Sequence, residues 1–128
     1  MEITVGMKGV ATTVVEREDT AAVIGSGLLL VYATPCMIAL MEGAASEAIS
    51  PALSEEQSSV GTALNIAHIS ATPVGLEVRA EAVVTKVEGK TIYFDVAAYD
   101  EKGKIGEGTH TRVVVNAQRF LDKAYSKV

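Results

Sequence analysis

Glu42 is the first candidate for chemistry, because the sequence sets its carboxylate among apolar residues. At about 100° per residue, four helix positions fall within roughly 60° of Glu42 and form an otherwise apolar stripe: Pro35, Ile38, Ala45 and Ile49. An ionised carboxylate is rarely buried without a partner, since its desolvation costs several kcal/mol. Glu42 therefore either serves a site or, at a domain edge, reaches solvent or pairs with an arginine.

Thr34 and Pro35 open the helix that would carry this carboxylate. Thr34 suits the N-cap, where its hydroxyl accepts a hydrogen bond from a free backbone N–H, and Pro35 suits the first helical position. The predicted helix runs from about Pro35 to Ile49 and ends at Ser50-Pro51. The free N–H groups at its start favour negative charge, so an acyl carbonyl could be polarised beside Thr34 while that residue also caps the helix.

His68 is the third candidate, on the more apolar face of a predicted strand. Its row contains the even-numbered residues Val60, Leu64, Ile66 and His68, with Thr62 and Ser70 in the same row. A lone histidine in such a row is either a hydrogen-bonded core residue or a base. A carboxylate beside it, such as that of Glu42, would fix its tautomer and raise its pKa, as in other arrangements of nucleophile, base and acid.

Cys36 is the single cysteine of the chain. In the first helical turn its thiol could act as a nucleophile, but a small apolar residue packed in that turn is the favoured interpretation. One cysteine forms neither an internal disulfide nor a C-x-x-C metal motif, so we expect no metal site and a reducing compartment. No signal-peptide pattern and no apolar run of about 18 residues is present, so we expect a cytoplasmic protein without a membrane segment.

The 128-residue chain has the size of one domain, which we place at residues 1–128. Hydrophobic residues make up 48% of it but aromatic residues only 5%, so a sheet covered by a small-residue helix is favoured. The net charge of -5, without a cluster of basic residues, argues against nucleic-acid binding. Gly25-Ser26-Gly27 lacks the lysine and the strand-turn-helix context of phosphate-binding motifs, so we expect no cofactor.

Alternating residues predict five strands, one before the helix at residues 7–16 and four after it near 60–70, 76–85, 91–99 and 105–115. This order predicts an α+β structure with an antiparallel meander and one covered sheet face. The outward row of Tyr93, Asp95 and Tyr99 is expected to face solvent.

Residues 63–69 carry little charge for a sheet edge, which predicts pairing with a second subunit. We expect residues 25–31 to form a flexible turn and an apolar segment over the site, and residues 117–127 to form a short helix over the sheet.

Five fragments in this order resemble the fluoroacetyl-CoA-thioesterase-like family: Ala33-Thr34-Pro35, residues 40–45 (LMEGAA), Val60-Gly61-Thr62, residues 67–75 (AHISATPVG) and residues 106–112 (GEGTHTR). The similarity runs from about Gly6 to Val115. It implies a hot-dog fold, in which an antiparallel sheet wraps around one long central helix, and a homodimeric thioesterase, with a tetramer left open. It also implies that Thr34, Glu42 and His68 act together, that Gly61 is a position of close approach, and that Arg112 belongs to the site or contacts the CoA part.

The resemblance implies hydrolysis of an acyl-CoA. Thr34 would attack or position water, His68 would act as base and protonate the thiol, and Glu42 would orient His68 or activate water, with a covalent intermediate and direct water attack both open. The acyl pocket would be lined by residues 23–32, Leu28 among them, and by Pro35. Since Leu28-Leu29-Leu30 offers no aromatic residue where a fluoroacetyl-selective relative would carry a gating Phe, a short or medium acyl group is the expected class.

Two other functions stay open. A non-catalytic hot-dog dimer could bind acyl-CoA or another apolar ligand, although it would not need Glu42 in its apolar stripe. A CoA-dependent hydratase or dehydratase would use an Asp and His pair, for which the sequence offers no convincing Asp. His110 and Arg112 are interpreted equally well as site residues or as strand residues on a polar face.

Overall fold

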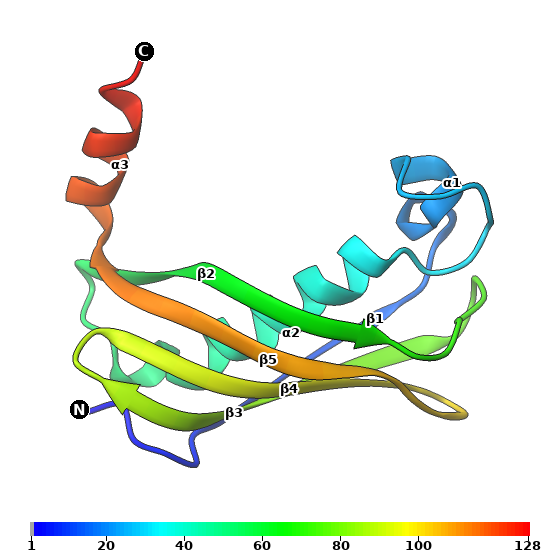
Figure 1. Ribbon diagram of the computed structural model, residues 1–128, viewed down its shortest axis with the longest axis horizontal. Coiled ribbons are helices and arrows are strands. Elements are labelled where there is room, and N and C mark those ends of the chain that lie inside the picture. Colours follow the sequence, from blue (N-terminus) through cyan, green and yellow to red (C-terminus); the bar gives the residue numbers. More distant parts are fainter. Residues whose placement is uncertain (1) are drawn as a thin grey trace.

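The computed structural model describes residues 2–128 and contains one curled antiparallel sheet around one long helix (Figure 1). The strands are β1 (Lys8–Val14), β2 (Gln57–His68), β3 (Glu77–Glu88), β4 (Thr91–Asp100) and β5 (Gly103–Asn116), in the spatial order β1-β3-β4-β5-β2. The helices are α1 (Ala21–Ile24), α2 (Thr34–Ile49) and α3 (Ala117–Tyr125), with short 3-10 turns η1 (Arg17–Asp19) and η2 (Ser50–Ala52). Among residues 2–128, no helix is both long and apolar enough to cross a bilayer.

The core lies between α2 and the concave face of the sheet. The inward rows predicted for β3 and β4 are confirmed, since the following residues are buried: Val78, Ala80, Ala82, Val84, Ile92, Phe94, Val96 and Ala98. Small residues bring α2 close to β1, and a side chain at Gly9 would overlap the backbone of Ala44 and Ala48. The composition rich in Ala and Gly therefore sets the helix-to-sheet distance.

The predicted face of β2 is wrong in its first half, because the strand carries a bulge at Thr62. Gly61 pairs with Arg112 and Ala63 with Thr111, so one residue of β2 has no partner on β5. Such an insertion reverses the side to which the following residues point. The face that carries Leu64, Ile66 and His68 therefore continues through Gly61 and Ser59, and Val60 lies on the opposite face.

The helix predicted near the carboxyl end is present but does not lie over the sheet. Asn116 caps it by accepting a hydrogen bond from the backbone N–H of Arg119 at 3.0 Å, and the N–H of Ala117 donates to the carbonyl of Glu56 at 2.9 Å. These bonds start α3 directly at the end of β5, so the helix projects from the body (Figure 1). α1, which precedes α2 in the chain, projects on the same side near the other end of β2, and β2 is the edge strand that runs between the two projections.

Candidate active site

Thr34 and His68 are in contact at the start of α2. The Oγ1 atom of Thr34 lies 2.7 Å from Nδ1 of His68, which occupies the last position of β2. The N-cap prediction for Thr34 is wrong: Ala33 is the N-cap, Thr34 is the first helical residue, and no side chain caps the helix. The hydroxyl of Thr34 is therefore committed to the imidazole and not to the helix backbone.

The environment of His68 favours its neutral form. Burial lowers the pKa of His68 below its ordinary value, and the backbone of Ser70 acts in the opposite direction with a smaller effect. Its Nε2 atom is buried and, among residues 2–128, has no hydrogen-bond partner. A neutral imidazole beside a hydroxyl can accept the hydroxyl proton.

A hollow of about 560 Å³ opens next to this pair. Thr34, Pro35 and His68 line it together with Ser26 and Ser70, among others, so the predicted substrate-binding role of Pro35 fits its position. Leu28 does not line it and is 94% exposed. The left-handed backbone of Gly25 ends α1 and turns the following leucines outward, so the expected apolar cover is not formed by this chain alone.

Glu42 lies in a second cluster, with Arg112 and Gly61. Its Oε2 atom is 3.6 Å from Nη1 of Arg112, which is only 7% exposed. A side chain at Gly61 would overlap this carboxylate, so the predicted close approach at Gly61 is observed. Burial lowers the pKa of Arg112, which nevertheless stays protonated, and the charge of Glu42 opposes that shift.

His110 completes this cluster and is not on a polar strand face. Its Nδ1 lies 2.8 Å from the carbonyl of Ala63 and its Nε2 lies 3.2 Å from Nη1 of Arg112. Arg112 also donates to Ser59, from Nε to the hydroxyl at 2.8 Å and from Nη2 to the carbonyl at 2.9 Å. Since an arginine only donates, Nε2 of His110 must accept, and this assigns a neutral ring protonated at Nδ1.

The sequence missed Ser59, because the bulge at Thr62 that sets its face is visible only from the pairing with β5. It also did not decide the face of His110. The alternation of His110 with Arg112 placed them on one face without saying which face is buried.

The two clusters are separate within the described chain. Eight helical residues, about 12 Å, separate Thr34 from Glu42, and roughly 20 Å of strand separates Gly61 from His68. Among residues 2–128, Glu42 forms no hydrogen bond or ion pair with Thr34 or His68. The expectation that Glu42 orients His68 is therefore not met inside one chain.

Cys36 is not set up as a nucleophile. It is half-buried, and burial, followed by the charge of Asp19, raises the pKa of its thiol. A raised pKa keeps the thiol protonated near neutral pH, where only the thiolate attacks. The favoured sequence interpretation, a small apolar residue in the first turn of α2, agrees with this environment.

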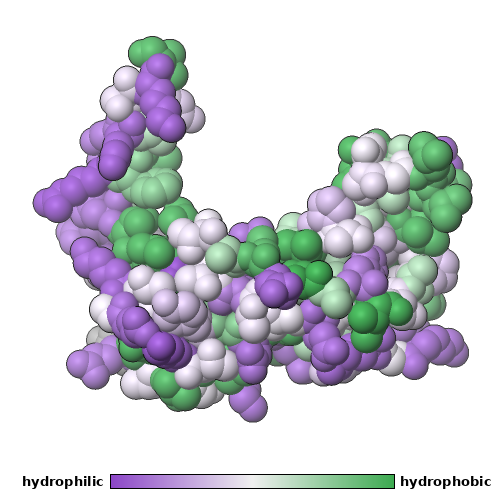
Figure 2. Space-filling model, in the orientation of Figure 1, coloured by the Kyte–Doolittle hydropathy of each residue, from purple (hydrophilic) through white to green (hydrophobic). Residues whose placement is uncertain are grey.

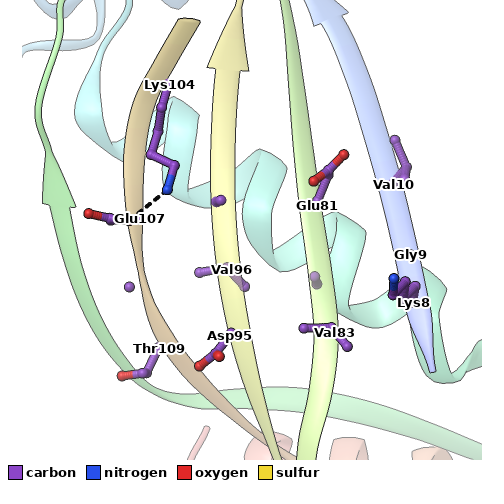
Figure 3. A pocket seen from close by; sticks show the side chains of 13 residues that line it. Lys8, Gly9, Val10, Glu81, Val83, Asp95, Val96, Lys104, Glu107 and Thr109 are labelled. Carbon is purple, nitrogen blue, oxygen red and sulfur yellow. Dashed lines mark hydrogen bonds and ion pairs between the residues drawn. The ribbon is translucent and has the colours of Figure 1, made fainter. Parts of the chain in front are cut away.

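Another hollow, of about 550 Å³, lies on the outer face of the sheet away from α2 (Figure 3). Its wall carries exposed charges of both signs, including Asp95 and the ion pair of Lys104 with Glu107 at 2.8 Å. None of the predicted site residues lines it. This face agrees with the predicted solvent-facing row and offers no group of the kind found at Thr34 and His68.

Gly61→Ala is expected to disturb the Glu42 cluster more than the fold. The new methyl group would displace the Glu42 carboxylate, the mobile end of a flexible side chain, and would lie 3.1 Å from the buried ring of His110, so the free energy of unfolding should fall by about 1–3 kcal/mol. Any activity that depends on Glu42 should fall at least tenfold, by an estimate of about 1.4 kcal/mol in the barrier. Gly43→Ala is the matched control, since its methyl group meets no atom within 4 Å and should stabilise α2 slightly. Urea unfolding and activity are compared, and equal activity of both variants would contradict the assignment.

The protein is expected to lose stability as the pH falls below about 6.5. Burial lowers the pKa of His110, and the positive charge of Arg112 lowers it further. The folded state therefore binds fewer protons than the unfolded chain in acid. The free energy of unfolding should then fall with decreasing pH, by at most about 1.4 kcal/mol per pH unit from this histidine. Urea unfolding at pH 7.5 and 5.5 measures the effect, and a His110→Gln variant with an unchanged pH dependence would show that His110 is not its source.

Comparisons with known proteins agree on one family. A family model described as fluoroacetyl-CoA-specific thioesterase matches residues 15–118. The fluoroacetyl-CoA thioesterase of Streptantibioticus cattleyicolor is 40% identical over 97 residues, which cover 76% of this chain and 70% of that protein.

Solved structures are similar over nearly the whole chain. A crystal structure of the fluoroacetyl-CoA thioesterase FlK has a TM-score of 0.94 at 33% identity and covers 100% of this chain and 99% of its own. A thioesterase superfamily member from Thermus thermophilus has a TM-score of 0.85 at 31% identity, covering 99% and 98%. A hot-dog-like protein from Thermanaerovibrio acidaminovorans, at 24% identity, also reaches 0.85, and the predicted hot-dog fold is confirmed. By the match over residues 15–118 and these relatives, the chain belongs to the fluoroacetyl-CoA-specific thioesterase family.

Proposed function

We propose that the protein hydrolyses the thioester of a short or medium acyl-CoA to the free acid and CoA. The observation that carries this proposal is the 2.7 Å contact of the Thr34 hydroxyl with a partly buried His68, at a helix start that opens into a hollow. Membership of a thioesterase family supports the same reaction. The fluoroacetyl-CoA thioesterases among the relatives are named for that substrate. In this chain, residues 28–30 of the segment that borders the hollow are leucines and offer no gating Phe, which supports a short or medium acyl group.

The first turn of α2 supplies the polar groups that the reaction needs. Pro35 has no N–H, and the backbone N–H groups of Thr34 and Cys36 have no partner within the helix, so they can donate to the oxygen of an acyl carbonyl. Nδ1 of His68 accepts the proton of the attacking hydroxyl, either that of Thr34 or that of a water held by Thr34. The same proton then passes to the leaving CoA sulfur as the carbon–sulfur bond breaks. If Thr34 attacks, water cleaves the resulting acyl ester in a second cycle.

We further propose a homodimer in which the free edge strands β2 pair antiparallel about a twofold axis, with a tetramer left open. The unpaired backbone of β2 and its exposed Leu64 support this edge as an interface. Pairing about the middle of β2 would set Gly61 about 13 Å along the strand from the partner's His68, against roughly 20 Å within one chain. Glu42 would then serve the Thr34 and His68 pair of the partner. The single cysteine fits a reducing compartment, and we propose a cytoplasmic location.

Thiol release from a panel of acyl-CoAs, from acetyl to decanoyl and including aryl-acetyl forms, tests the reaction. We expect turnover that is highest for one acyl size and falls for longer chains. Tight binding of a panel member without thiol release would support the alternative, a non-catalytic protein that binds acyl-CoA or another apolar ligand. Sedimentation of the same preparation measures the proposed dimer independently of turnover.

A further inference from the structure

The helix α3 carries an apolar stripe that its own chain leaves uncovered. The stripe combines Ala117, Phe120, Leu121, Ala124 and Tyr125, at the spacing of one helix face. Phe120 is 43%, Leu121 49% and Tyr125 71% exposed. An isolated helix of 9 residues is only marginally stable in water, so this stripe requires a surface to pack on.

A second uncovered apolar patch lies at the other end of β2, on the segment of residues 20–32. A bridge between Thr20 and Tyr32 closes the base of this segment. Its exposed apolar residues are Val23, Ile24, Leu28, Leu29 and Leu30. The surface view shows apolar residues on both projections and along the floor between them (Figure 2). Ser26 and Val31 of the same segment line the hollow beside Thr34 and His68, so whatever covers the segment also borders the proposed acyl site.

The charges of the two projections are complementary. The helix α3 and the residues after it carry Arg119, Lys123 and Lys127 against one acidic residue, Asp122. The residues that lead into the 20–32 segment are Glu16, Arg17, Glu18 and Asp19, three acidic residues against one arginine. Opposite net charges of this kind favour the approach of the two surfaces and set their orientation.

One chain cannot bring these surfaces together, but two can. The 12 residues of β2 keep α3 and the 20–32 segment roughly 40 Å apart within a protomer. A twofold axis through the middle of an antiparallel β2 pair places the α3 end of one strand beside the 20–32 end of the other. We propose that α3 packs its apolar stripe on the 20–32 segment of the partner subunit and holds that segment over the partner's acyl site. This inference rests on the proposed dimer.

Crosslinking between chains tests the contact. In a Cys36→Ala background, a chain that carries both Leu29→Cys and Leu121→Cys is treated with a short bismaleimide. Most chains should become covalent dimers. The matched control combines Leu29→Cys with Lys123→Cys, whose side chain points about 160° away from Leu121 on the helix, and should crosslink several-fold less. Equal crosslinking of both pairs, or none, would overturn the contact. A crosslink within one chain is ruled out by the separation along β2.

Hydrogen exchange gives a second measurement that does not depend on the chosen cysteines. Phe120→Ser with Leu121→Ser should speed exchange of amides 20–32 by about tenfold or more, because the segment loses its cover. Asp122→Ser with Lys123→Ser, on the polar face of α3, leaves the net charge of the helix unchanged and should leave these amides unchanged. A sedimenting dimer with unchanged exchange would refute the α3 contact alone. A monomer would refute the proposed dimer as well, and thiol release by that monomer would leave the proposed reaction standing.

Discussion

Thr34→Ala is expected to lower kcat for the best acyl-CoA by about 10² or more, the scale of a lost nucleophile or positioned catalytic hydroxyl. The substitution removes the Oγ1 atom that lies 2.7 Å from Nδ1 of His68. It removes no helix cap, since Ala33 and not Thr34 is the N-cap, and alanine is the better helix former. The folded protein should therefore persist, so that the loss reports on chemistry. Thiol release under saturating acyl-CoA is the measurement.

Thr34→Ser is the matched control, because it keeps the hydroxyl and should retain most of the activity. Circular dichroism and thermal unfolding of both variants verify that α2 is intact. Turnover by Thr34→Ala within a few-fold of the unchanged protein would show that the hydroxyl neither attacks nor positions water, and would leave the helix N–H groups and His68 as the remaining candidates.

The pH profile of the same reaction reports on His68. If its neutral ring is the base, kcat/KM should fall on the acid side with an apparent pKa below the ordinary 6.5 of histidine, because burial lowers the pKa of His68. In the Thr34→Ala variant the residual rate should lose this dependence. An unchanged acid limb in that variant would assign the limb to another group.

The sequence predicts those parts of the fold in which the type of each residue, apolar or polar, indicates whether its side chain is buried. In β3 and β4 the alternation of Val78, Ala80, Ile92 and Phe94 with polar neighbours states directly which face is buried. The bulge at Thr62 is different, because it arises from the pairing of β2 with β5, and no pattern within β2 marks it. The direction of α3 depends on the cap at Asn116 and on the bond of Ala117 to Glu56, neither of which follows from helical periodicity.

The candidate site could likewise be predicted from the sequence only in part. The apolar stripe of α2 singled out Glu42, and pairing with an arginine, one of the two ordinary accounts of that carboxylate, is met by Arg112 at 3.6 Å. The contact of Thr34 with His68 joins residues far apart in sequence, so only the resemblance to a family indicated it. The separation of Glu42 from this contact could not be predicted, because it depends on how far apart α2 and β2 hold the two clusters. That separation is the strongest reason to expect a site built from two chains.

Mixed dimers are expected to recover activity that neither parent has. A chain with Glu42→Gln and a chain with His68→Ala should each form homodimers that lose kcat by about 10² or more. If Glu42 serves the partner's His68, a heterodimer of the two contains one site with both groups intact and one site with neither. Heterodimers purified with two different tags should then show about half of the kcat per dimer of the unchanged protein. Glu42→Gln leaves the bonds of Arg112 to Ser59 and His110 in place, so the fold should tolerate it.

Mixing Thr34→Ala with His68→Ala provides the control within the same design. These two residues touch in one chain, so every site of that heterodimer lacks one of them and should stay inactive. Recovery in the first mixture and not in the second would require Glu42 to act from the opposite subunit. No recovery in either would mean that Glu42 reaches His68 inside one chain after a rearrangement of α2 against β2. Recovery in the second mixture would instead separate Thr34 from His68, and the catalytic pair itself would have to be abandoned.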